Sequence, residues 1–135
     1  VGIIRRENEI EEALAEIDGF KARIKNVTVT GGRAFNPGWH LAIDLRNMLV
    51  VSECVAKAAL ARHESRGGHT REDYPGMNPQ WRLKNLVEVL DGDEVELIEQ
   101  PTPIMPTELF MLFEKSELAK YVTEEELAGL PGEPS

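Results

Sequence analysis

A long helical pattern that begins at Pro37 constrains the fold of this 135-residue chain more than any other feature. Asn36 suits the N-cap of a helix, and Pro37 suits its first turn. Apolar residues then recur at helical spacing across residues 41–60 on a broad face. The pattern predicts a helix over residues 37–66 that is ended by Gly67-Gly68 and buried on more than one side.

A second helical pattern lies upstream, over residues 8–26. Asn8 is the candidate N-cap. Acidic residues fill the first turn and basic residues lie near the other end, as the helix dipole favours. Small side chains such as Ala56 and Ala59 let another element approach the longer helix closely. We therefore expect two helices packed side by side.

The rest of the chain predicts short elements. Residues 84–90 and 94–99 are expected to form strands around the turn Asp91-Gly92-Asp93. Prolines then impose an extended connector, and short helices are expected from Thr107 and from Thr123. The predicted fold class is mainly α: an incomplete helical bundle with a short β-hairpin and an acidic helical tail.

This pattern predicts two parts. The first, residues 1–75, is a helical bundle domain that includes a loop over residues 62–75. The second, residues 76–135, holds the β-hairpin, the proline-rich connector and the acidic C-terminal helical extension. A chain of this length is ordinarily one compact unit with its own core.

Charge excludes two classes of partner. The formal net charge is −9, carried by the C-terminal third: residues 1–87 hold 13 Lys or Arg and 11 Asp or Glu, whereas residues 88–135 hold 2 and 13. A chain of this charge is not expected to bind nucleic acid or an anionic membrane surface. The sequence also lacks an apolar run long enough to insert into a membrane.

Chemistry-bearing residues are few. His40, His63 and His69 do not follow a zinc-ligand spacing, and Cys54 is the single cysteine, expected as a small buried apolar side chain. No Gly-x-Gly-x-x-Gly or nucleophile-elbow motif is present. We therefore predict no catalytic, cofactor-binding or metal-binding residue in this chain.

The segment over residues 62–75 is the densest polar stretch. It alternates guanidinium groups, carboxylates, glycines and an aromatic ring, which favours a loop of charge-assisted hydrogen bonds. We interpret it as a polar lock that ties the end of the long helix to another body, in this chain or outside it. The candidate docking residues are Arg62, Glu64, Arg66, His69, Arg71, Glu72, Asp73 and Tyr74.

Glu64 to Pro75 reads ESRGGHTREDYP, and this stretch resembles the signature near the C-terminus of succinate dehydrogenase and fumarate reductase flavoprotein subunits. Every fixed position of that signature is met. The resemblance covers about residues 1–100, including the helix through Cys54 to Leu60, the opening Val1 to Arg5, and Trp81. The start Asn36 to His40 and the acidic tail resemble the actinobacterial branch.

The resemblance implies the C-terminal helical domain of such a subunit. The parent would interconvert succinate and fumarate with FAD, on the cytoplasmic side of the cell membrane, and pass electrons to an iron–sulfur subunit. FAD is implied for the parent and no cofactor for this piece, whose partners would be the FAD-binding domain and the iron–sulfur subunit. The family's three-helix bundle would place its first long helix before Val1, which leaves an apolar groove. We therefore expect the isolated piece to self-associate.

Two alternatives stay open. L-aspartate oxidase shares a related C-terminal domain, so the parent enzyme would differ while the role of the domain would not. A free-standing helical protein-interaction domain explains the charge and the lack of chemistry, but not the complete loop signature.

Overall fold

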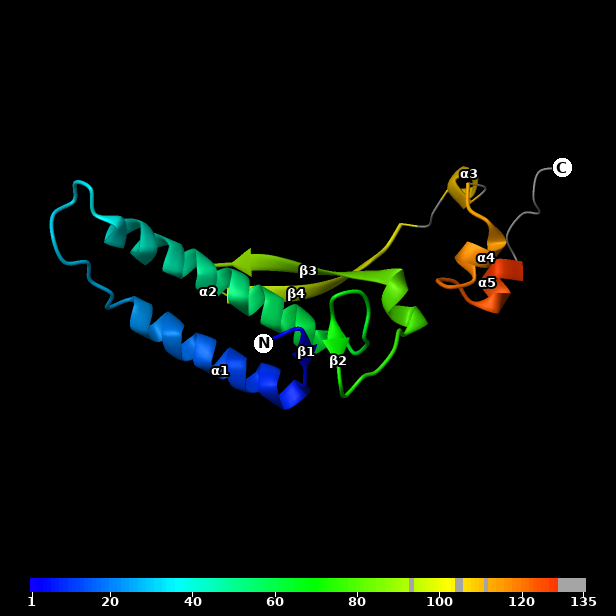
Figure 1. Ribbon diagram of the computed structural model, residues 1–135, viewed down its shortest axis with the longest axis horizontal. Coiled ribbons are helices and arrows are strands. Elements are labelled where there is room, and N and C mark those ends of the chain that lie inside the picture. Colours follow the sequence, from blue (N-terminus) through cyan, green and yellow to red (C-terminus); the bar gives the residue numbers. More distant parts are fainter. Residues whose placement is uncertain (93, 104–105, 111, 129–135) are drawn as a thin grey trace.

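The computed structural model describes residues 1–135 except 93, 104–105, 111 and 129–135. Two helices, α1 (Glu7–Ile24) and α2 (Pro37–Ala61), run side by side as a hairpin, and the ribbon formed by β3 (Lys84–Asp91) and β4 (Glu94–Pro101) lies along α2 (Figure 1). The remaining elements are short: β1 (Ile4–Arg5), β2 (Thr70–Arg71), the 3-10 helix η1 (Pro79–Leu83), α3 (Thr107–Phe110), α4 (Lys115–Leu118) and α5 (Glu124–Ala128). The mainly α class with a β-hairpin is confirmed.

The core lies between α1 and α2. Ile10 of α1 is fully buried against Ala56 and Ala59 of α2, whose small side chains let the two helices approach closely, as predicted. Leu14, Ile17 and Leu60 pack around this centre. A core this small leaves much of the chain's apolar surface for other contacts.

One buried charge joins the two helices further along. The Glu53 carboxylate of α2 accepts from Lys21 Nζ of α1 (2.5 Å) and from Lys57 Nζ one turn on (2.9 Å). Burial by itself raises the pKa of Glu53, but the hydrogen bonds from both ammonium groups outweigh it and hold the pKa below its usual range. Glu53 is therefore a charged contact between α1 and α2.

The end of α2 differs from the prediction. The helix stops at Ala61, not at residue 66, because Arg62 takes an extended backbone conformation and Arg71 donates to the last carbonyl groups. Gly67 and Gly68 instead form a tight turn in which the backbone groups of Arg66 and His69 bond each other at 2.8 and 3.0 Å. Gly67 has a φ of 58°, which glycine adopts without strain.

The start of α1 also differs. Asn8 lies inside the helix, and the N-cap is Arg6, whose side chain makes no capping hydrogen bond. The Asp73 carboxylate caps this end instead, accepting from the Glu7 backbone N–H at 2.9 Å. A cap supplied from 66 positions away leaves no local sequence signal.

The β-hairpin is antiparallel, with Leu90 opposite Val95 and Val87 opposite Ile98. Val95 is buried, and the Lys57 ammonium of α2 donates to its carbonyl oxygen at 2.7 Å, so the ribbon is fixed to the helix. Trp81 of η1 is buried at the other end of the ribbon. Both strands match the predicted positions, extended by one and two residues.

Among the described residues, the C-terminal part holds three short helices, and the single helix expected from Thr107 is divided into α3 and α4. Leu118 of α4 is buried. In the apolar run 109–113, Leu109, Leu112 and Phe113 are exposed. Residue 111 of that run lies outside the described residues. Within the part of the chain described here, no helix is both long and apolar enough to span a bilayer.

Candidate functional site

The predicted polar lock closes within this chain, on the first seven residues. β1 pairs in parallel with β2, so that Ile4 lies opposite Thr70 and Arg5 opposite Arg71. The Glu72 backbone N–H donates to the Arg5 carbonyl oxygen at 3.0 Å, which extends the pairing. The body that the loop over residues 62–75 holds is therefore the segment leading into α1.

Arg71 is the centre of the lock and is fully buried. Its Nη1 donates to the carbonyl oxygens of Ala59 (2.8 Å) and Leu60 (3.0 Å), at the C-terminal end of α2. Its Nε and Nη2 both donate to the Asp73 carboxylate at 2.7 Å, and Nη2 also reaches Glu7 at 3.3 Å. The fork-shaped guanidinium thus satisfies helix carbonyls and a carboxylate together, which a lysine cannot do.

Arg71 and Asp73 each stabilise the charged form of the other. The hydrogen bonds from Arg71 keep the pKa of Asp73 well below its usual range, and the Glu7 N–H adds to this. The bond to Asp73 likewise raises the pKa of Arg71. Both groups stay charged at neutral pH, cation at the α2 carbonyl end and anion at the α1 amide end, as the two helix dipoles favour.

Glu64 is a second buried charge. Its carboxylate accepts from Arg62 Nη1 (2.6 Å), from Arg66 Nε (2.9 Å) and from the Asn78 backbone N–H (2.9 Å). Burial raises the pKa of Glu64, but the bonds from Arg66, Asn78 and Arg62 outweigh it and leave the pKa lowered. Glu64 therefore fixes the loop to the start of η1.

The hydrogen bonds of this network fix the tautomer of His69. Nδ1 accepts from Arg5 Nη1 at 2.7 Å, because arginine only donates, so Nε2 carries the proton and donates to the Arg62 carbonyl oxygen at 3.1 Å. Burial lowers the pKa of His69, and the neighbouring guanidinium groups lower it further. The ring is a neutral structural connector, not a charged one.

Aromatic contacts complete this end of the molecule. Tyr74 stacks on His63 with ring centroids 4.5 Å apart, and the Arg71 guanidinium lies 4.9 Å from the centre of the Tyr74 ring. Trp81 is covered by Arg62 at 5.3 Å and by Lys84 at 4.1 Å. Of the predicted docking residues, Glu72 and Asp73 are the exposed ones, and Glu72 pairs with Arg6.

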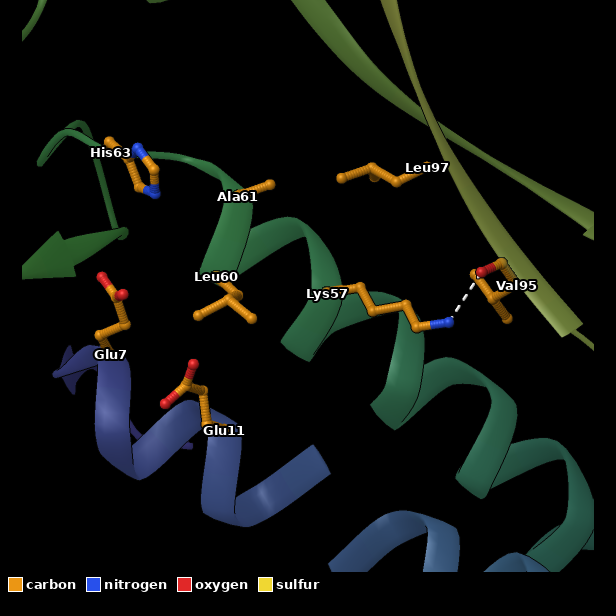
Figure 2. A pocket seen from close by; sticks show the side chains of 8 residues that line it. All are labelled: Glu7, Glu11, Lys57, Leu60, Ala61, His63, Val95 and Leu97. Carbon is orange, nitrogen blue, oxygen red and sulfur yellow. Dashed lines mark hydrogen bonds between the residues drawn. The ribbon is translucent and has the colours of Figure 1, made fainter. Parts of the chain in front are cut away.

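An open cavity of about 460 Å³ lies between α1, α2 and β4. Figure 2 shows the carboxylates of Glu7 and Glu11 on the α1 side and Leu97 and Val95 on the strand side, with Lys57 bonded to the Val95 carbonyl oxygen. Leu60, Ala61 and His63 complete the lining. The described side chains that line this cavity are not grouped to hold a metal ion.

The histidines do not converge. His40 lies in the first turn of α2 and His63 follows its last, about 30 Å along the helix axis. Among the described residues, no three His, Cys, Asp or Glu side chains are grouped to hold a metal ion. Cys54 is partly buried, and burial together with the nearby Glu88 raises the pKa of its thiol. A thiol in that state is a poor nucleophile at neutral pH.

One apolar surface lies exposed on α2, in a chain for which the sequence predicted an apolar groove. Leu41, Leu45, Met48 and Val55 recur on one face of α2, and all four side chains are exposed in this chain. The helix was expected to be buried on more than one side, which is wrong for these residues within the described chain. We call these four residues the α2 stripe. An exposed apolar line of this length is typical of an interaction surface.

The fold and the lock define a helical-hairpin domain that carries structural charge networks. A family described as the C-terminal region of fumarate reductase flavoproteins matches residues 1–117, and the chain belongs to that family. In the Mycobacterium smegmatis Sdh1 complex in the apo form, the similar chain is 56% identical with a TM-score of 0.86, over 96% of this chain and 23% of that chain.

Two curated relatives show the range of the family. The fumarate reductase flavoprotein subunit of Helicobacter pylori is 42% identical over 88 residues, which are 64% of this chain and 12% of the relative. L-aspartate oxidase of Acinetobacter baylyi is 35% identical over 98 residues, 73% of this chain and 17% of the relative. The chain thus spans less than a quarter of the length of these proteins.

Proposed function

We propose that this chain is the non-catalytic C-terminal packing domain of a flavoprotein subunit that interconverts succinate and fumarate. The supporting observation is the α2 stripe: Met48 is 62% exposed and Leu41 69% exposed, on a chain whose relatives are several times longer. Burying such side chains contributes about 1.5–3 kcal/mol each. The occupant of the stripe is the flavin-binding remainder of the subunit.

Flavin chemistry belongs to that remainder. FAD sites of this kind use a parallel sheet whose first strand leads through a glycine-rich turn into a helix. The described residues contain a two-residue parallel pair and an antiparallel hairpin, so they do not fit the cofactor. The contribution of this chain is mechanical: it supplies a rigid surface on which the flavin-binding part packs.

The lock gives that surface its shape. Because Arg71 and Glu64 are buried and bonded to groups inside the chain, docking through the loop over residues 62–75 would use its outer side, near the Gly67-Gly68 turn and Glu72.

Electrons of the parent enzyme would pass to an iron–sulfur subunit at the cytoplasmic face of the membrane. We also retain the division into residues 1–75 and 76–135 as part of the proposal.

L-aspartate oxidase is the second candidate for the parent, because its relatives match up to 73% of this chain. The domain would have the same packing role there. Assay of the complete subunit with succinate and with L-aspartate separates the two. The family match to residues 1–117 favours either parent over a free-standing interaction domain.

A pair of variants in the complete subunit tests the packing role. Met48→Glu places a carboxylate in the stripe, and Asn47→Glu places the same group on an exposed position of α2 outside it. Met48→Glu is expected to lower the FAD content of the purified subunit and its resistance to proteolysis, while Asn47→Glu leaves both unchanged. Equal behaviour of the two variants would contradict the proposed function.

A further inference from the structure

Phe35, in the loop between α1 and α2, combines an unfavourable backbone conformation with a fully exposed ring. Phe35 has a φ of 55° and a relative exposure of 103%, so its backbone is left-handed and its ring is fully in solvent. Asn, Asp and Gly are the residues that favour this backbone region, and a bulky side chain there is strained. An exposed ring on a strained backbone gains nothing from the rest of this chain.

The loop is nevertheless built to hold that geometry. The Asn36 side-chain amide donates to the carbonyl oxygens of Thr30 and Gly32, each at 2.9 Å, and its oxygen accepts from the Gly38 N–H at 3.0 Å. Val29 packs so closely on Gly38 that a Cβ at that position would lie 2.8 Å from the valine side chain. These contacts close the loop on either side of Phe35 and hold the backbone that carries the ring.

The surroundings of the ring are basic and aromatic. The Arg33 guanidinium lies 5.7 Å from the centre of the Trp39 ring, and Trp39 is itself exposed. Residues 19–46 hold five Lys or Arg and one Asp, in a chain whose net charge is −9. Arg and Trp are enriched among the residues that dominate binding energy at interfaces.

We infer that Phe35 is an anchor that inserts into an apolar pocket, rimmed by carboxylates, on the flavin-binding remainder of the subunit. This rests on the proposed function, because the tip of the helical hairpin adjoins the α2 stripe: Phe35 lies just before the N-cap Asn36, and Leu41, the first residue of the stripe, lies near the start of α2. A rigid, preorganised loop loses little conformational freedom on binding, which favours a pocket of fixed shape.

Other occupants fit less well. A two-fold pairing of copies centred on this tip would bring two basic tips together. An anionic bilayer would be repelled by the carboxylates of α1, which carries five Glu and one Asp along its length. Figure 1 shows the tip at the end of the molecule remote from the C-terminal helices, so those helices do not cover it.

Thiol labelling in the complete subunit tests the anchor. Phe35→Cys, Met48→Cys and Asn47→Cys are made separately, and maleimide modification of each site is followed by peptide mass spectrometry in the native state. Position 35 is expected to label about 10- to 100-fold more slowly than position 47, the range that burial of a large apolar side chain supplies. Rapid labelling at 35 with protection at 48 would overturn the anchor and leave the packing role intact. Rapid labelling at both would contradict the proposed function itself.

A photo-reactive phenylalanine analogue at position 35 identifies the occupant. The inference expects a cross-link within the same polypeptide, to a peptide of the flavin-binding part that carries Asp or Glu. A cross-link to a second copy, to another subunit or to lipid would overturn it. Phe35→Asn relieves the backbone strain while removing the ring, so it is expected to retain the fold of the hairpin and to lose the protection of position 48 in part.

Discussion

Arg71 and Asp73 join the end of one helix to the beginning of the other. Arg71 donates to the Ala59 and Leu60 carbonyl oxygens of α2, Asp73 accepts from the first N–H of α1, and two hydrogen bonds of 2.7 Å connect the pair. The signature stretch is therefore an internal clamp. It connects the C-terminal end of α2 to the N-terminal end of α1.

Removing the Arg71 guanidinium should destabilise the junction between the two helices. Arg71→Ala leaves the Ala59 and Leu60 carbonyl groups without their donor, and the expected loss is about 3–5 kcal/mol in the free energy of unfolding. Arg71→Lys should recover little, because one ammonium cannot reproduce the fork. Urea unfolding measures the change. Arg6→Ala is the control, since the Arg6–Glu72 pair is exposed and its loss should leave the midpoint unchanged.

Acid should weaken the clamp through Asp73. Its folded pKa is depressed, so its stabilising effect is complete above the unfolded pKa of about 3.9 and is lost as the pH falls through the folded value. Asp73→Asn should lower stability at pH 7 and flatten the dependence below about pH 4. Thermal unfolding from pH 2 to 7 checks this. An unchanged acid slope in the variant would mean that other carboxylates carry the effect.

His69 sets a second pH window. Because its folded pKa is also lowered, the unfolded chain binds a proton before the folded chain does, and stability falls as the pH drops below about 6.5. His69→Gln keeps an acceptor and a donor but cannot take up the proton. Its unfolding midpoint should be less sensitive to pH between 5 and 7 than that of the parent chain. Equal slopes would exclude His69 as the group responsible.

Close packing of the helices depends on Ala56. The residue is buried beside Ile10, and Ala56→Leu would push the helices apart, at a cost of about 1–3 kcal/mol. Ala15→Leu makes the same change on an exposed position of α1 and should be nearly neutral. Differential scanning calorimetry of both variants separates core overpacking from a general effect of leucine.

Elements with a local signal were predictable. Asn36 and Pro37 marked the start of α2, and the side-chain bond from Asn36 to the Gly38 N–H confirms the cap. Turn residues around Gly92 marked the hairpin. The helical pattern also revealed both long helices, because their apolar residues repeat with the period of the element.

Long-range contacts explain the errors. The end of α2 is set by Arg71, ten residues past Ala61, and the start of α1 is set by Asp73, 66 positions further along the chain. A pattern read along the chain registers neither. The resemblance predicted an apolar groove but not the residues that form it, since an apolar face looks the same in sequence whether its partner is present or not.

The isolated chain should self-associate through that stripe. Exposed Leu41, Met48 and Val55 favour pairing of copies in the absence of the flavin-binding part. Light scattering should show a mass above 15.1 kDa that falls toward the monomer in Met48→Glu but not in Asn47→Glu. A sharp monomer at high concentration would count against the prediction.

The most direct test of the account is the accessibility of residue 48 in the complete, native flavoprotein subunit. A cysteine at 48 is compared with one at 47, which is exposed on α2 outside the stripe. The account predicts that the thiol at 48 stays unmodified by maleimide until the subunit is unfolded, while the thiol at 47 reacts at once. Equally rapid modification of both would show that nothing packs on α2, and would contradict the role proposed for this chain.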